Sequence, residues 1–172
     1  MKTFSLAAAV AVALTLVAGS QASAATATAN ATAQIVVAIS ITKTDDLDFG
    51  DVAAGDVDGT VIMSPASARS ATGGATLVNT GTGNAAAFDV VGEPNATYSI
   101  SLPTSIVLNA LVPNGLAGVG MLVDDFTSNP SLTGELNGSG TQALTVGATL
   151  HVGASQPSGT YTNTFDVTVA YN

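Results

Sequence analysis

Side chains able to carry out catalysis are few in this sequence. The 172 residues include one histidine, His151, and no cysteine. A Ser–His–Asp site would have to use His151, which lies on the polar side of an alternating segment, where a solvated surface histidine is the simpler interpretation. Paired carboxylates can hydrolyse glycosides, but such sites also bind sugars on exposed aromatic rings, and the chain has no tryptophan and only three tyrosines. We therefore expect that the protein is not an enzyme.

Carboxylates are concentrated in one short segment. Six aspartates lie within the fourteen residues from Asp45 to Asp58, and Asp56-Val-Asp58-Gly59 is similar to the start of a calcium-binding loop. Calcium takes about six to eight oxygen ligands, and the rest of such a loop, with its final glutamate, is missing here. The competing interpretation is that these aspartates form turns on a solvated edge. We expect no cofactor and no metal, with Asp56 and Asp58 as the calcium candidates.

The start of the sequence predicts export. Lys2, the apolar run Leu6–Ala18 and the small residues Ala22-Ser23-Ala24 are the three parts of a secretory signal peptide. Cleavage after Ala24 leaves Ala25–Asn172. The apolar run is too short to span a bilayer as a stable helix, so we expect no membrane insertion once the signal is removed. The predicted location is the periplasm in transit, and then the cell surface or the extracellular space.

The predicted mature chain is strongly acidic. Two basic residues, Lys43 and Arg69, stand against twelve acidic residues, which gives a net charge of −10. Such a chain repels nucleic acid and anionic membranes, because phosphate binding requires basic residues. A chain of this length suits one domain with a real core. Without cysteine, that core depends on packing and strand pairing alone.

Apolar and polar residues alternate along most of the chain, which predicts strands and no helix. In Thr97–Leu102 one face is apolar, and in Ala143–Val152 the even-numbered residues point inward. Long loops are expected at Ser64–Gly74 and Asn109–Gly118. The fold prediction is all-β: a single antiparallel β-sandwich, immunoglobulin-like or pilin-like. The expected strands are Gln34–Thr42, Leu47–Val52, Thr60–Ser64, Ala75–Asn79, Ala86–Gly92, Thr97–Leu102, Ser105–Leu108, Val119–Asp125, Leu132–Leu136, Ala143–Val152 and Thr160–Tyr171.

One alternating segment is unusually long. From Ala25 to Ile41 every odd-numbered residue is apolar, and most even-numbered residues are polar or small. A ribbon of this length would span about 55 Å, roughly three times a common strand. Part of it is therefore expected to pair outside its own domain. We divide the chain into a signal peptide at 1–24, an N-terminal extension and donor-strand candidate at 25–33, and a β-sandwich domain at 34–172.

The last fourteen residues form a second long alternating segment. Chaperone–usher pilins carry a glycine fourteen residues from the C-terminus and a penultimate tyrosine, and Gly159 and Tyr171 occupy those places, so this segment resembles a pilin terminal strand. In that family the strand lines an open groove that receives the N-terminal extension of the next subunit, a form of β-strand addition. The resemblance implies an assembly groove lined by Gly159, Tyr161, Phe165, Val167, Val169 and Tyr171, and a donor strand with Ala29, Ala31, Ala33, Ile35 and Val37.

Two features depart from the pilin pattern. Pilins generally have a disulfide, and this chain has no cysteine. The apolar residues from Ala25 to Ala33 are also smaller than those of usual donor strands, and each buried methyl contributes only about 0.8 kcal/mol. The resemblance implies self-association or sister subunits as partners, together with a periplasmic chaperone and an outer-membrane usher.

A further resemblance rests on short segments that follow one another along nearly the whole predicted mature sequence: Leu47–Gly50, Gly59–Val61, Ser64-Pro65, Arg69-Ser70, Gly73-Gly74, Gly92–Pro103, Leu144–Leu150, Gln156-Pro157 and Gly159–Tyr161. In these segments the chain resembles the bacterial family known as domain of unknown function 4402. This resemblance implies an exported β-rich protein of Gram-negative bacteria and carries no activity. The ending is also similar to secreted proteins of the spore coat protein U type, which are themselves pilin-like.

Two functional hypotheses follow. The leading one is a non-enzymatic structural subunit of a cell-surface fimbria or extracellular layer, assembled by β-strand donation. In this hypothesis Gly159 lets strands approach closely at the start of the terminal strand. The alternative is a self-complete secreted binding module, an adhesin or matrix protein that binds carbohydrate.

Overall fold

The computed structural model describes residues 23–78, 83–111 and 119–172. The predicted signal peptide, 1–24, lies almost entirely outside these residues, as does most of the predicted loop Asn109–Gly118. The chain divides into residues up to Gln34 and a second part, Ile35–Asn172. No helix long and apolar enough to cross a bilayer occurs in the described ranges.

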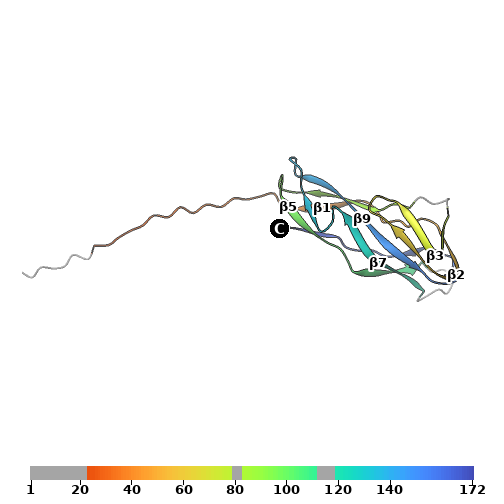
Figure 1. The fold of residues 1–172 in the computed structure, drawn as a ribbon. Helices are drawn as coiled ribbons and strands as arrows, with labels where there is room; N and C mark the ends of the chain where they lie inside the picture. Colours follow the sequence, from red (N-terminus) through yellow and green to blue (C-terminus); the bar gives the residue numbers. More distant parts are fainter. Residues whose placement is uncertain (1–22, 79–82, 112–118) are drawn as a thin grey trace, which may run out of the picture. The chain divides into compact units, whose positions relative to one another are not determined.

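The second part is built from strands that form two antiparallel sheets packed on each other (Figure 1). The larger sheet has the order β1-β4-β9-β7-β6-β10, with β2 paired to both β3 and β9, and the smaller sheet has the order β11-β5-β8. This arrangement confirms the predicted all-β antiparallel sandwich. The strands are β1 Ser40–Asp45, β2 Val52–Met63, β3 Arg69–Leu77, β4 Ala86–Val91, β5 Thr97–Ser101, β6 Ser105–Ala110, β7 Gly120–Asn129, β8 Thr133–Glu135, β9 Thr141–Val152, β10 Tyr161–Thr162 and β11 Thr168–Tyr171.

Strand β9 organises the larger sheet and the core. One of its edges pairs with β4 and then with β2, and the other edge pairs with β7. Its even-numbered residues from Leu144 to Val152 are at most 4% exposed, as the alternation predicts. Leu144 and Val146 belong to one buried cluster, which also contains Tyr98 of β5. The other three, Ala148, Leu150 and Val152, belong to a second cluster around Phe49 and Val61.

The predicted loop Ser64–Gly74 is wrong, because β3 begins within it at Arg69. Two small residues let this strand lie close to β2: a Cβ at Gly74 would stand 2.0 Å from the carbonyl oxygen of Val57, and Gly73 has a φ of +64°. Sequence alternation does not report such contacts, because glycine contributes no side chain to the pattern.

Two predicted strands differ from the structure near the ends of the domain. Leu47–Val52 forms only an isolated bridge between Asp48 and Asn84 before β2 begins. The predicted terminal strand Thr160–Tyr171 is divided into β10, which pairs with β6, and β11, which pairs with β5 in the other sheet. The chain therefore crosses from one sheet to the other between Asn163 and Val167.

The long ribbon predicted from Ala25 to Ile41 is not a strand in the single chain. Strand β1 begins only at Ser40, and residues 23–38 are all exposed. Ile35, the largest apolar residue between Ala25 and Val37, is 97% exposed. An extended segment becomes a strand only when a neighbour satisfies its backbone groups. Residues 25–38 have no strand partner among the described residues, so their predicted strand pairing stays a prediction.

Candidate assembly site

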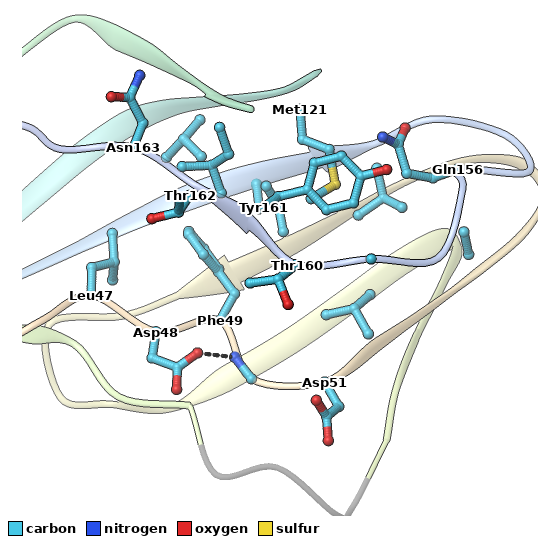
Figure 2. Close-up of a pocket in the computed structure, with 18 of the residues that line it drawn as sticks. Leu47, Asp48, Phe49, Asp51, Met121, Gln156, Thr160, Tyr161, Thr162 and Asn163 are labelled. Carbon is cyan, nitrogen blue, oxygen red and sulfur yellow. Dashed lines mark hydrogen bonds between the residues drawn. The ribbon is translucent and has the colours of Figure 1, made fainter. Parts of the chain in front are cut away.

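A groove opens over one end of the core (Figure 2). It has a volume of about 650 Å³. One wall is the segment Leu47–Ala54, and the other wall runs from Gln156 to Phe165. The floor consists of apolar side chains from three neighbouring strands: Ile106 and Leu108 of β6, Met121 and Val123 of β7, and Leu150 and Val152 of β9.

The first wall is held by a tight turn. The backbone of Asp48 exchanges two hydrogen bonds with Asn84, of 2.9 and 2.8 Å, and the Asp48 carboxylate accepts a 2.7 Å hydrogen bond from the Gly50 N–H. The Arg69 guanidinium donates to the Phe49 carbonyl oxygen at 2.7 Å. A Cβ at Gly50, where φ is +67°, would stand 2.3 Å from this guanidinium, so the turn requires glycine.

The second wall is tied to the sheet by side chains. The Tyr161 hydroxyl donates to the Pro157 carbonyl oxygen at 2.7 Å, and the Asn163 amide donates to the Val107 carbonyl oxygen at 2.8 Å. The Asn163 contact extends the attachment of this wall to β6 beyond the two paired residues of β10. The Phe165 ring then packs on Phe126, with ring centres 5.1 Å apart.

Both walls present strand edges that have no partner among the described residues. In the described part of the chain, β10 is the last strand of its sheet and pairs only with β6. Within the same ranges, residues Val52–Ala54 pair only with β3, because β2 first meets β9 at Gly59. A groove with an apolar floor and an open edge on each side has the shape and chemistry to accept an extended peptide.

One polar group in the groove wall lacks a partner. The Nε2 atom of Gln156 is buried and, among the described residues, has no hydrogen-bond partner. A buried donor left unsatisfied costs about 1–3 kcal/mol, so such groups are uncommon. If the Gln156 side chain turned toward the groove, a carbonyl oxygen of a strand lying there would satisfy it. In the sequence Gln156 stands out only as part of the family-like segment Gln156-Pro157, and no pattern there indicates its role.

The residues predicted to line an assembly groove are divided by the structure. Gly159, Tyr161 and Phe165 line the groove. Val167, Val169 and Tyr171 are half-buried against the other core cluster. The predicted close approach at Gly159 is not made within this chain, because nothing lies within 4 Å of a Cβ built there.

The residues predicted as a donor strand fall into two groups. Ala29, Ala31, Ala33 and Ile35 are exposed and in no strand. Val37 is also exposed, but its backbone is held by two side chains: its N–H donates to Glu93 Oε2 at 2.9 Å, and its carbonyl oxygen accepts from the Tyr171 hydroxyl at 2.7 Å. The role of Glu93 is not visible in the sequence.

The carboxylate candidates do not form a metal site. Among the described residues no group of three or more His, Asp or Glu side chains is placed to hold an ion. Asp56 is exposed, and Asp58 accepts a 2.8 Å hydrogen bond from the Ala154 N–H. His151 and Asp124 form a half-buried pair at 2.8 Å on neighbouring strands.

Comparison with known proteins identifies the family. The model of a domain of unknown function, number 4402, matches residues 39–171. The chain belongs to this family. No match was found among curated proteins or among solved structures. Three segments within the matched range have structural roles: Leu47–Gly50 forms part of one wall of the groove, Gln156-Pro157 begins the other, and Gly92–Pro103 carries the Glu93 contact to Val37.

Proposed function

We propose that the protein is a non-enzymatic structural subunit of a cell-surface fimbria or extracellular layer, assembled by β-strand donation. The N-terminal extension of one copy occupies the groove of the next. One observation carries the proposal: the chain contains a strand-like segment without a partner and an apolar groove between two strand edges that lack a partner in the described residues.

The dimensions of the two parts agree. The wall Leu47–Ala54 would accept a strand of about eight residues, or roughly 26 Å. Residues 25–36 can extend to about 40 Å, which fills that length and leaves a connection between copies. The inserted backbone would pair with the open edge of β10 or of Val52–Ala54, and one of its carbonyl oxygens would accept from Gln156 Nε2.

The chemistry of the extension also suits the groove. Residues 25–36 contain no charged side chain, although the predicted mature chain has a net charge of −10. An uncharged strand avoids the repulsion that a typical segment of this acidic protein would meet at a second copy. A strand of about eight residues places about four side chains on the floor, here Ala29, Ala31, Ala33 and Ile35. Each alanine methyl contributes about 0.8 kcal/mol, and Ile35 contributes up to about 3 kcal/mol when fully buried. Each main-chain hydrogen bond adds about 1 kcal/mol.

The predicted signal peptide and the resemblance to pilins complete the proposal. The chain would be exported, held by a periplasmic chaperone and passed to an outer-membrane usher before it reaches the cell surface. Sister subunits or further copies of this chain are the proposed partners.

The test compares two purified forms by size-exclusion chromatography with light scattering. One form is 25–172 and the other is 34–172. The proposal predicts that the longer form assembles and that the shorter form is a folded monomer. A synthetic peptide of residues 25–36 should then bind the shorter form, whereas a peptide of equal composition without the alternation should not. Two equally stable monomers, or equal binding of both peptides, would contradict the proposal.

The second candidate is a self-complete secreted module that binds carbohydrate. The observation that favours it is the lining of the groove, which combines the Tyr161 ring with the polar side chains of Asp48 and Gln156 (Figure 2). Sugar sites combine an aromatic surface with a few polar groups in this way. Saturable glycan binding by monomers of both forms would favour this function over the first.

A further inference from the structure

Val37 is held by a small arrangement of side chains that we call the Val37 clasp, made of Val37, Glu93 and Tyr171. Glu93 Oε2 accepts from the Val37 N–H at 2.9 Å, and the Tyr171 hydroxyl donates to the Val37 carbonyl oxygen at 2.7 Å. The same hydroxyl accepts from the Glu93 N–H at 2.6 Å. Both backbone groups of Val37 are therefore satisfied by side chains, at a position where no strand pairs with it.

The clasp is built into the domain. Tyr171 lies in β11, opposite Tyr98 of β5, and its ring packs against the core cluster that contains Tyr98. A Cβ at the buried Gly92 would stand 2.3 Å from the Tyr171 hydroxyl oxygen, so the glycine leaves the space that this hydroxyl occupies. The Gly92 N–H donates to the Gly140 carbonyl oxygen at 2.8 Å, which fixes the loop that carries Glu93. Packing thus positions the hydroxyl before any contact with Val37.

We propose that the Val37 clasp anchors the base of the extension, so that the donor strand ends at residue 36 and its second half, with Ile35, reaches only the groove of another copy. The clasp follows from its own contacts, and its role in assembly rests on the proposed function. While the clasp is closed, Val37 has no backbone group free to pair with a second subunit. Val37 is therefore an anchor residue, and Ile35 is the last large side chain available for donation.

Geometry then opposes insertion of the extension into its own groove. Strand β1 separates the clasp from the groove, whose first wall begins at Leu47, and its six residues span about 20 Å. Ile35 lies two residues from the anchored Val37 and reaches only about 7 Å. The whole of residues 25–36 reaches about 40 Å, so at most its first half could return to the groove of the same chain. Donation is directed head to tail, and contacts of that kind produce open filaments or rings.

The clasp is tested by hydrogen exchange on the chain 25–172, read at the Val37 amide. The Val37 amide donates to Glu93 Oε2, and the Tyr171 hydroxyl holds both the Glu93 N–H and the Val37 carbonyl oxygen. Tyr171→Phe removes this hydroxyl and keeps the ring, so Glu93 and Val37 lose the contact that holds them together. We expect exchange at the Val37 amide to rise about five- to tenfold, with β1 unchanged. The matched control is Tyr98→Phe, in the same sheet as Tyr171. It removes a hydroxyl that donates to Gln142 Oε1 at 2.8 Å and forms no hydrogen bond with Val37. This control should leave exchange at Val37 unchanged.

Three results would overturn the inference: an unprotected Val37 amide in the unaltered chain, no effect of Tyr171→Phe, or equal effects of both variants. All samples are compared at the same oligomeric state, checked by light scattering. Failure of the proposed function would show itself differently, as assembly that does not depend on residues 25–33. If the Val37 amide is protected from exchange in a chain that never assembles, the result supports the clasp and contradicts the subunit function.

Discussion

Replacing Ile35 with alanine should weaken assembly without changing the stability of the folded monomer. The Ile35 side chain is 97% exposed in the single chain, so its truncation removes no contact from the folded monomer. In an assembled pair, the substitution removes three buried carbon atoms at about 0.8 kcal/mol each. The sum, about 2.4 kcal/mol, corresponds to an affinity roughly 50-fold weaker. Light scattering over a dilution series measures this change, and thermal unfolding of the monomer measures stability.

Ile39→Ala is the matched control. Ile39 is half-buried and packs against the core cluster that contains Tyr98, so its truncation should lower the free energy of unfolding by about 1–2 kcal/mol. The two variants remove the same atoms four residues apart. Ile35→Ala should weaken assembly and leave monomer stability unchanged, whereas Ile39→Ala should lower monomer stability. Loss of monomer stability in Ile35→Ala, or unchanged assembly, would refute the assignment of Ile35 as a donor residue.

Three further predictions concern the groove, the clasp and pH. Gln156→Leu removes a buried donor that has no partner among the described residues, so the monomer should gain about 1 kcal/mol of stability in urea unfolding. Assembly should weaken at the same time. Loss of monomer stability would contradict this role of Gln156. Gly92→Ala should cost about 1–3 kcal/mol, because the new Cβ meets the Tyr171 hydroxyl, whereas Gly159→Ala should leave the monomer nearly unchanged. Burial raises the pKa of Tyr98 above 10.0. The unfolded chain then loses this proton first, so stability should fall as the pH rises above about 10. Urea titrations should show this fall, and Tyr98→Phe should reduce it.

Much of the sandwich is predictable because alternation reports which face of a strand is buried. In β9 each inward residue from Leu144 to Val152 is buried as expected. Near the end of the chain Phe165, Val167, Val169 and Tyr171 are half-buried, while the residues between them are exposed. Alternation does not report which strand is the neighbour. This is why one predicted strand is in fact two strands in two sheets.

The candidate site was only partly predictable, because it depends on contacts between distant segments. Gly159, Tyr161 and Phe165 are on the groove as expected, but the opposite wall comes from Leu47–Ala54, more than a hundred residues earlier. Glu93 and Gly92 matter through the position of the Tyr171 hydroxyl. Periodicity along one segment contains no information on such contacts.

Cysteine crosslinking between two populations of the chain tests the central claim most directly, because the sequence has no cysteine of its own. One population carries Thr160→Cys on the groove wall, and the other carries a single cysteine at successive positions from Ala29 to Gln34. Strand donation predicts disulfides between copies whose yield alternates with a period of two along the extension. Absence of crosslinks between folded copies, or equal yields at every position, would contradict the account.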